Sequence, residues 1–250
     1  KQMTDYCHQR GIIAGVDVSL HMLQQKAFQL YRNFPASWRS KENQMDIRLA
    51  KLFEADWDIL NVEFSSTEFS SGNVKKKKKL QLHLGKELKE KYDSKLMGRK
   101  HVVQESEEMG GNKKKKDYVM NEEETALDKN RGVLIHTVFF YTIFEETAQV
   151  YRNKNLRHML DLLLKEREVR ETWYYPESAY WVTFDSSIPM LLLPYLSARL
   201  DDILFVDSLK TSGHVTFSSG WEWGYWLFDW SIARWSWKHE TNGVAQQPTA

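Results

Sequence analysis

The chain has a single cysteine and almost no net charge, and each scarcity excludes a class of protein. One cysteine, Cys7, in 250 residues rules out an intramolecular disulfide framework but leaves the cellular compartment open. The formal net charge of +1 at pH 7 provides no general attraction to nucleic acid or to an anionic membrane. No apolar run approaches the roughly 20 residues that span a bilayer. We therefore predict neither a nucleic-acid partner nor a membrane partner.

Several motifs of cofactor binding and catalysis are missing as well. No glycine-rich phosphate loop follows a predicted strand, which argues against a nucleotide-binding α/β sheet. The serines do not stand in a G-x-S-x-G elbow, so a hydrolase serine triad is not indicated. The H-E-x-x-H zinc motif does not occur either. The sequence predicts no cofactor.

What the chain does contain is enough apolar material for a sizeable core, because 42% of its residues are hydrophobic and 13% are aromatic. Short apolar runs typical of buried strands alternate with segments of helical periodicity. The predicted strands are 11–19, 57–64, 95–104, 132–141, 172–184 and 214–218. The predicted helices are 20–32, 43–54, 74–92, 156–168, 187–204 and 221–238.

This alternation indicates βαβ units and a parallel sheet. An open doubly wound sheet and a closed eight-stranded barrel both fit it. We favour the barrel, because polar and aromatic residues follow several different strands, as a barrel site requires. The predicted fold is α/β, a single parallel (βα)8 TIM-type barrel domain over residues 1–250. The chain begins at Lys1 inside a predicted helix, so an N-terminal truncation is expected.

A charged low-complexity insertion is predicted at about 105–131. It carries lysines at 113–116 and glutamates at 122–124, and such blocks usually form solvated loops. Neither these lysines nor those at 75–79 have aromatic or arginine residues interleaved that could stack on bases or read them. The lysine runs therefore do not indicate a nucleic-acid site.

Aromatic residues are concentrated in two segments. Six of the ten tryptophans fall within 221–237, and a second cluster occupies 173–185. Aromatic rings that line a pocket stack on the flat faces of sugars as they do on other apolar surfaces. The helical spacing of tryptophans 226, 230 and 237 predicts that they pack in the core. The predicted substrate-binding residues are Tyr180, Trp181, Asp185, Trp221, Trp223, Tyr225 and also His136, which lies inside an apolar strand.

Three glutamates among aromatic residues are the catalytic candidates: Glu63, Glu177 and Glu222. Glycoside hydrolysis needs one protonated and one ionised carboxyl group facing one pocket. An apolar surround raises the pKa of the acid by desolvation. We expect Glu63, at a strand end, to act as acid or base with Glu222 or Glu177 as its partner. The alternative is that Glu63 bonds loop amides or pairs with an arginine.

Histidines at several strand ends suggest a different site. His21, His101, His136 and Asp185 are the candidate ligands of a barrel metallohydrolase, which collects histidines and carboxylates from different strands. The paired His-x-His motif of such enzymes is missing. The principal prediction therefore contains no metal.

The strings NVEF, PESAYW and FSSGWEWGYW resemble the (βα)8 glycoside hydrolases and their barrel relatives over about residues 11–226. The resemblance implies a barrel that cleaves glycosidic bonds. The Asn-Glu dipeptide of one large group of these enzymes is absent, since Val62 precedes Glu63. The strings also look like an uncharacterised bacterial-type family, which implies no activity, so catalytic roles are not transferred.

The sequence thus predicts a carbohydrate-active hydrolase with a pair of carboxylates in an aromatic-lined cleft, binding a carbohydrate ligand. A metal-dependent barrel hydrolase and a non-catalytic carbohydrate-binding barrel are the alternatives.

Overall fold

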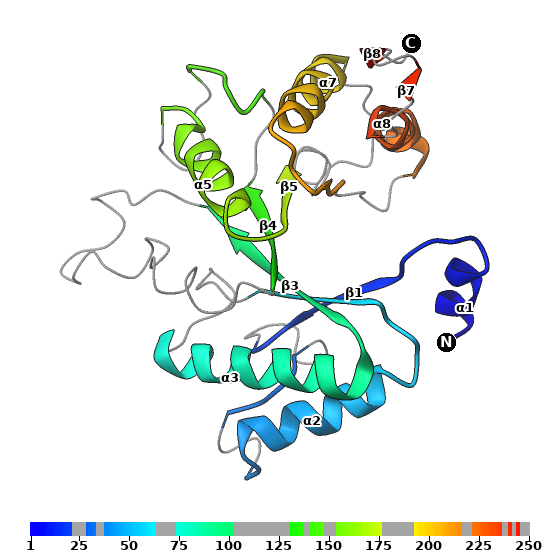
Figure 1. The fold of residues 1–250 in the computed structure, drawn as a ribbon, viewed down its shortest axis with the longest axis vertical. Helices are drawn as coiled ribbons and strands as arrows, with labels where there is room; N and C mark the ends of the chain where they lie inside the picture. Colours follow the sequence, from blue (N-terminus) through cyan, green and yellow to red (C-terminus); the bar gives the residue numbers. More distant parts are fainter. Residues whose placement is uncertain are drawn as a thin grey trace, which may run out of the picture. The chain divides into compact units, whose positions relative to one another are not determined.

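A computed structural model describes residues 1–21, 29–33, 38–63, 74–102, 131–137, 141–147, 154–176, 193–216, 222–236, 240–241 and 244–245. Its fold is α/β, with one all-parallel sheet of six strands in the order β1-β2-β3-β4-β5-β6 (Figure 1). The strands are β1 (Gly15–Ser19), β2 (Ile59–Glu63), β3 (Lys95–His101), β4 (Gly132–Thr137), β5 (Thr172–Pro176) and β6 (Gly213–His214). The predicted parallel α/β class is confirmed, while closure into an eight-stranded barrel stays a prediction.

The helices of the described ranges are α1 (Gln2–His8), α2 (Lys41–Leu52), α3 (Val74–Glu87), α5 (Arg157–Arg167), α7 (Leu193–Ser208) and α8 (Glu222–Ser236). A π-helical turn, η2 (Leu88–Tyr92), continues α3, and β7 (Glu240–Thr241) pairs antiparallel with β8 (Val244–Ala245). None of the helices in these ranges is long and apolar enough to cross a membrane.

The predicted helix at 20–32 is wrong at its end. Gln29 forms a parallel bridge with Ser19, and the Leu30 N–H donates to the Ser19 carbonyl at 2.8 Å. The Tyr31 N–H donates to the Leu20 carbonyl at 3.1 Å. These bonds run to the end of β1 instead of to the preceding helical turn, so the helical spacing of apolar residues was overridden by strand pairing.

The chain divides into two compact units, and each is described by itself. The first comprises 1–101 with 112–133, and the second comprises 102–111 with 134–250. The predicted insertion at 105–131 lies outside the described residues except for Arg131, which is buried. That the whole chain forms one domain stays a prediction.

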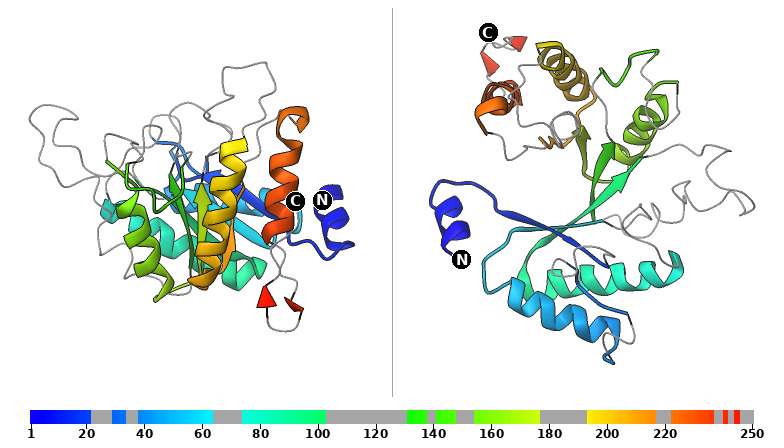
Figure 2. Two further views of the ribbon diagram at one scale, coloured as in Figure 1. Left: turned by 90° about the horizontal axis from the view of Figure 1, so that it is seen from above. Right: turned by 180° about the vertical axis from the view of Figure 1, so that it is seen from behind.

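In the first unit, α2 and α3 cover one face of the β1–β3 part of the sheet (Figure 2). The Ser40 hydroxyl starts α2 by accepting the Asn43 N–H at 3.1 Å, which satisfies one of the donors that a helix start leaves unpaired. In each helix, apolar residues three or four positions apart lie on one side, and this side packs on the sheet. The resulting core contains Val18, Leu60, Val62 and Leu96 of the strands with Met45, Leu49, Leu80, Leu84 and Leu88 of the helices.

The opposite face of these strands carries polar residues, because side chains alternate along a strand. The parallel register places Asp17 beside Asn61, and one row further along it places Ser19, Glu63 and Arg99 side by side. These rows lie toward the carboxyl ends of the three strands.

The second unit has a small apolar core between α7 and α8, formed by Ile203, Phe228 and Ile232. The prediction that Trp226 and Trp230 pack in the core is wrong, because both side chains are exposed. Phe228 and Ile232 occupy the stripe that faces α7, and the two tryptophans lie on another stripe of the same helix. Trp237 lies outside the described residues.

A buried polar network ties β5 to α7 in the same unit. The Tyr174 hydroxyl donates to Asp202, and Arg199 Nη1 lies 3.0 Å from Asp202 Oδ2. The Ile143 N–H donates to the other carboxylate oxygen of Asp202 at 2.8 Å. Burial raises the pKa of the Tyr174 hydroxyl well above its ordinary value and raises the pKa of Asp202 as well. Both charged side chains are fully enclosed, so this network stabilises the packing of α7 on β5.

Candidate functional site

The polar face of β1–β3 carries the candidate site, which we call the Arg99 cluster: Asp17, Asn61, Glu63 and Arg99. Arg99 Nη1 donates to Asp17 Oδ2 at 3.0 Å, and Arg99 Nη2 donates to Glu63 Oε2 at 3.2 Å. Asn61 Nδ2 donates to the same Asp17 oxygen at 3.0 Å. The guanidinium thus joins carboxylates from two neighbouring strands.

The members of the cluster differ in how far solvent reaches them. The Glu63 side chain is 10% exposed, whereas that of Asp17 is 46% exposed. A charge pair that is partly withdrawn from water is held more firmly than a surface pair, because screening by solvent is weaker. Glu63 is therefore held firmly, and Asp17 is the more solvent-exposed of the two carboxylates.

The formal charge of the cluster is −1, from two carboxylates and one guanidinium. Because the guanidinium lies between the carboxylates, these acids neutralise an arginine and do not converge on a metal ion. The four planar side chains offer N–H donors from Arg99 and Asn61 together with carboxylate acceptors. Such a set suits a neutral ligand with several hydroxyl groups, each of which can donate and accept.

Most of the other predicted site residues lie beyond what the structure describes. Glu177, Tyr180, Trp181, Asp185 and Trp221 fall outside the described residues. The remaining three, Glu222, Trp223 and Tyr225, belong to the first turns of α8, and their side chains are not described. The predicted pairing of Glu63 with a second glutamate therefore stays a prediction.

The predicted histidines are placed individually. His136 is buried on β4, its ring centroid 4.5 Å from that of Tyr175, and its carbonyl accepts the Val102 N–H at 2.7 Å. His21 stacks on Tyr31 at 5.5 Å between ring centroids and lies 3.0 Å from the Asn33 amide nitrogen. Within the described ranges, neither histidine belongs to a group of three converging metal ligands.

Sequence reasoning named Glu63 and noted that it could pair with an arginine, but it missed Asn61 and Arg99. The signal was the alternation of polar and apolar residues in these strands, in ILNVE and in the neighbouring KLMGRKH. Two-residue periodicity places Asn61 and Glu63 on one face. Only the register of the strands brings Arg99 beside them.

No protein-family model matches this chain, and neither a curated protein nor a solved structure matches it.

Proposed function

We propose that this protein is a carbohydrate-active hydrolase in which Glu63 is the ionised carboxylate of the active site. The observation that carries the proposal is the contact between Glu63 and Arg99 at the carboxyl end of β2. An ion pair engages the negatively charged form of the acid. That form attacks an anomeric carbon or activates water, whereas the proton must come from a second acid.

The chemistry of the Arg99 cluster favours a sugar over an anionic ligand. Its formal charge of −1 repels phosphate and carboxylate groups, while its donors and acceptors pair with hydroxyls. Asp17 and Asn61 are suited to hold sugar hydroxyls. Their mutual hydrogen bond fixes both side chains in position, and Asp17 is half-exposed to solvent. Rings at Trp181, Trp221, Trp223 and Tyr225 remain the expected stacking platform.

The sheet is proposed to be part of a (βα)8-type barrel. Its strands follow one another in chain order, whereas a doubly wound sheet reverses its order at a switch point. In the first unit, the helices that follow β1 and β2 pack on the same face of the sheet. The polar face is then the inner one, and barrel enzymes act at the carboxyl ends of the strands.

In this mechanism Arg99 orients the Glu63 carboxylate, and Asp17 shares that arginine. Glu63 either forms a glycosyl intermediate or withdraws a proton from water. Glu177 and Glu222 remain the candidates for the acid that protonates the leaving oxygen.

The test is hydrolysis of a panel of nitrophenyl glycosides by the wild-type chain, by Glu63→Gln and by Glu54→Gln. Glu54 is an exposed glutamate of the same unit and provides the matched control. We expect Glu63→Gln to lower kcat/KM by at least about 100-fold, the scale of losing a positioned acid–base group. Glu54→Gln should retain wild-type activity.

The same panel separates the alternatives. Binding of a glycan, measured by calorimetry, without turnover points to the non-catalytic carbohydrate-binding barrel. Activity that a chelator abolishes points to the metal-dependent hydrolase. Hydrolysis that is unchanged in Glu63→Gln would refute the role given to Glu63.

A further inference from the structure

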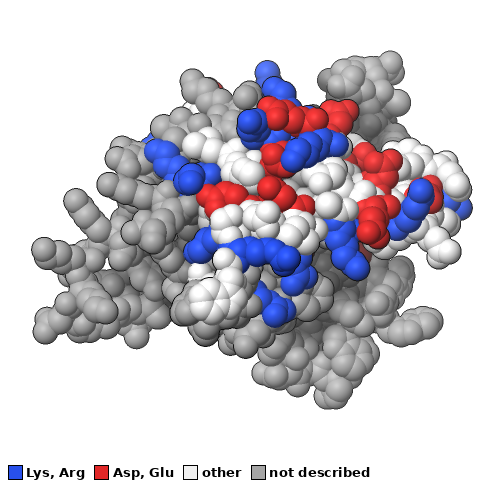
Figure 3. All heavy atoms as spheres, turned by 90° about the horizontal axis from the view of Figure 1, so that it is seen from below, with Lys and Arg blue, Asp and Glu red and all other residues white. Residues whose placement is uncertain are grey.

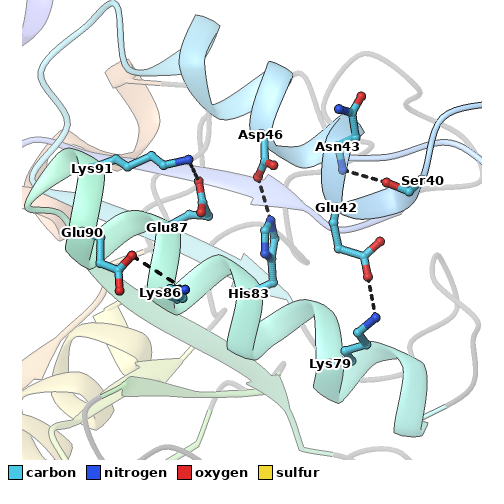
Figure 4. A network of polar contacts seen from close by, with 10 residues as sticks. All are labelled: Ser40, Glu42, Asn43, Asp46, Lys79, His83, Lys86, Glu87, Glu90 and Lys91. Atoms are coloured by element: carbon cyan, nitrogen blue, oxygen red, sulfur yellow. Dashed lines mark hydrogen bonds and ion pairs between the residues drawn. The ribbon is translucent and has the colours of Figure 1, made fainter.

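Three side chains with metal-binding chemistry converge between α2 and α3 (Figure 4). Asp46 comes from α2, and His83 and Glu87 come from α3. One donor atom from each lies within 4.8 Å of the other two, and His83 Nε2 lies 2.7 Å from Asp46 Oδ1.

The two helices hold this arrangement in place before any ion binds. His83 and Glu87 are four residues apart, so they project from one side of α3. Leu84, which lies between His83 and Glu87 in the sequence, is fully buried in the core. Met45, which precedes Asp46, is also fully buried there. The three donors are thus presented by a packed scaffold, which lowers the entropy cost of closing them around an ion.

A cation already occupies part of this arrangement. The Lys91 ammonium pairs with the Glu87 carboxylate, whose side chain is only 11% exposed (Figure 4). Lys91 itself is 55% exposed and lies on a flexible stem, so it can swing into solvent. Two carboxylates and one imidazole then remain facing each other with a formal charge of −2.

We propose that Asp46, His83 and Glu87 bind one divalent transition-metal ion of the zinc type, which displaces Lys91 from Glu87 and replaces the proton shared by His83 and Asp46, which leaves to solvent. One imidazole nitrogen and two carboxylate oxygens form a zinc-compatible set, with a fourth position left for water. Magnesium and calcium prefer oxygen ligands throughout, so the imidazole disfavours them. The bound ion clamps α2 to α3.

The competing interpretation is a set of surface ion pairs along α3 and between α3 and α2. Lys79 lies 3.1 Å from Glu42, and Lys86 lies 4.0 Å from Glu90, so charges of both signs alternate along this face (Figures 3 and 4). The two interpretations differ in the role of Lys91. In a set of surface ion pairs Lys91 is a partner, whereas at a metal site it is a competitor of the ion.

The experiment is calorimetric titration of zinc chloride into the chelator-treated 250-residue chain, with cobalt(II) absorption as a second readout. The variants are His83→Ala, Asp46→Asn and Lys91→Met, which keeps the apolar stem. His8→Ala is the control. His8 is also paired with aspartates, Asp58 and Asp56, but it does not belong to the group of three converging donors. Circular dichroism of each metal-free variant verifies the fold.

We expect zinc at about 100 times its Kd to raise the Tm of the wild type by about 5–10 °C. His83→Ala and Asp46→Asn should each weaken zinc binding at least about 10-fold. Lys91→Met should tighten it about 2- to 5-fold, the effect of removing one surface ion-pair competitor. His8→Ala should bind as the wild type does.

The proposal would be overturned if the wild type bound no zinc at about 1 mM, a range in which even weak sites fill. Wild-type affinity in the folded His83→Ala and Asp46→Asn variants would overturn it too, as would weaker binding by Lys91→Met. Magnesium that binds as tightly as zinc would also overturn it, because the imidazole then contributes nothing.

Discussion

At the scale of single residues, a hydrogen bond from His8, the last residue of α1, connects that helix to Asp58, which directly precedes β2. His8 Nε2 lies 2.8 Å from Asp58 Oδ2, and the Ala14 N–H donates to the same oxygen at 2.7 Å. The hydrogen bond to Asp58 raises the pKa of His8. The Ala14 N–H, and after it His8, lower the pKa of Asp58.

The raised pKa of His8 makes stability depend on pH in a defined direction. Its contribution is fully present below the unfolded value of 6.5 and is lost as pH rises through the higher folded value. We expect the wild type to exceed His8→Gln in unfolding free energy by more at about pH 5.5 than at about pH 8.5. Urea unfolding at both pH values measures this, and an equal difference at both would contradict it.

The loss of Asp202 should destabilise the fold strongly, because this carboxylate is the fully buried partner of Arg199. Removing one member of a buried ion pair leaves the other charge uncompensated, at a cost of about 3–5 kcal/mol. We therefore expect Asp202→Ala to lower the unfolding free energy by about that amount, since Arg199 is completely buried. Urea denaturation is the measurement. The double variant Arg199→Met/Asp202→Leu removes both charges but leaves the Tyr174 hydroxyl and the Ile143 N–H without their acceptor, so it should recover only part of the loss. No recovery at all would show that the uncompensated charge is not the cause.

At the scale of elements, the start of α2 depends on one hydroxyl. The Ser40 side chain accepts the Asn43 N–H and is exposed, so its replacement affects little else. Ser40→Ala should lower the unfolding free energy by about 1 kcal/mol, while Ser40→Gly should cost only a few tenths. Equal losses in both variants, measured by thermal unfolding, would speak against capping.

The contact between β5 and β6 depends on a glycine. A Cβ added at Gly213 would lie 2.9 Å from Trp173 Cδ2, too close for van der Waals contact, so the indole ring has to move. We expect Gly213→Ala to cost about 1–3 kcal/mol, as overpacking does. Gly15→Ala is the control, because its Cβ would meet Ile59 Cβ at an ordinary 3.4 Å. Equal Tm values for the two variants would contradict this prediction.

At the scale of the whole molecule, positive and negative charge nearly cancel. The chain has 35 basic and 34 acidic side chains, and both signs are interleaved on the face that Figure 3 shows. Interleaved charges produce no extended field of one sign. We expect elution from a heparin column at or below about 0.15 M NaCl, where screening acts over about 8 Å. Retention at higher salt would indicate a basic surface and contradict the prediction of no nucleic-acid partner.

Local periodicity predicted most elements of the fold because strands and helices alternate their apolar residues differently. The strand predicted at 132–141 corresponds to β4 and the helix predicted at 156–168 to α5. The errors arise where the sequence of a helix is compatible with more than one buried side. Trp226 and Trp230 share a helical stripe, yet α8 turns Phe228 and Ile232 toward α7 instead.

The sequence alone determined the α/β class, the alternation of elements and the position of Glu63 at a strand end, since these depend on residues near one another in the chain. Only the tertiary structure decided what Glu63 contacts. Arg99 is 36 residues from Glu63 and 82 from Asp17, and His83 is 37 residues from Asp46. Such pairings follow from strand register and helix packing, which depend on the whole core and leave no mark in the local sequence.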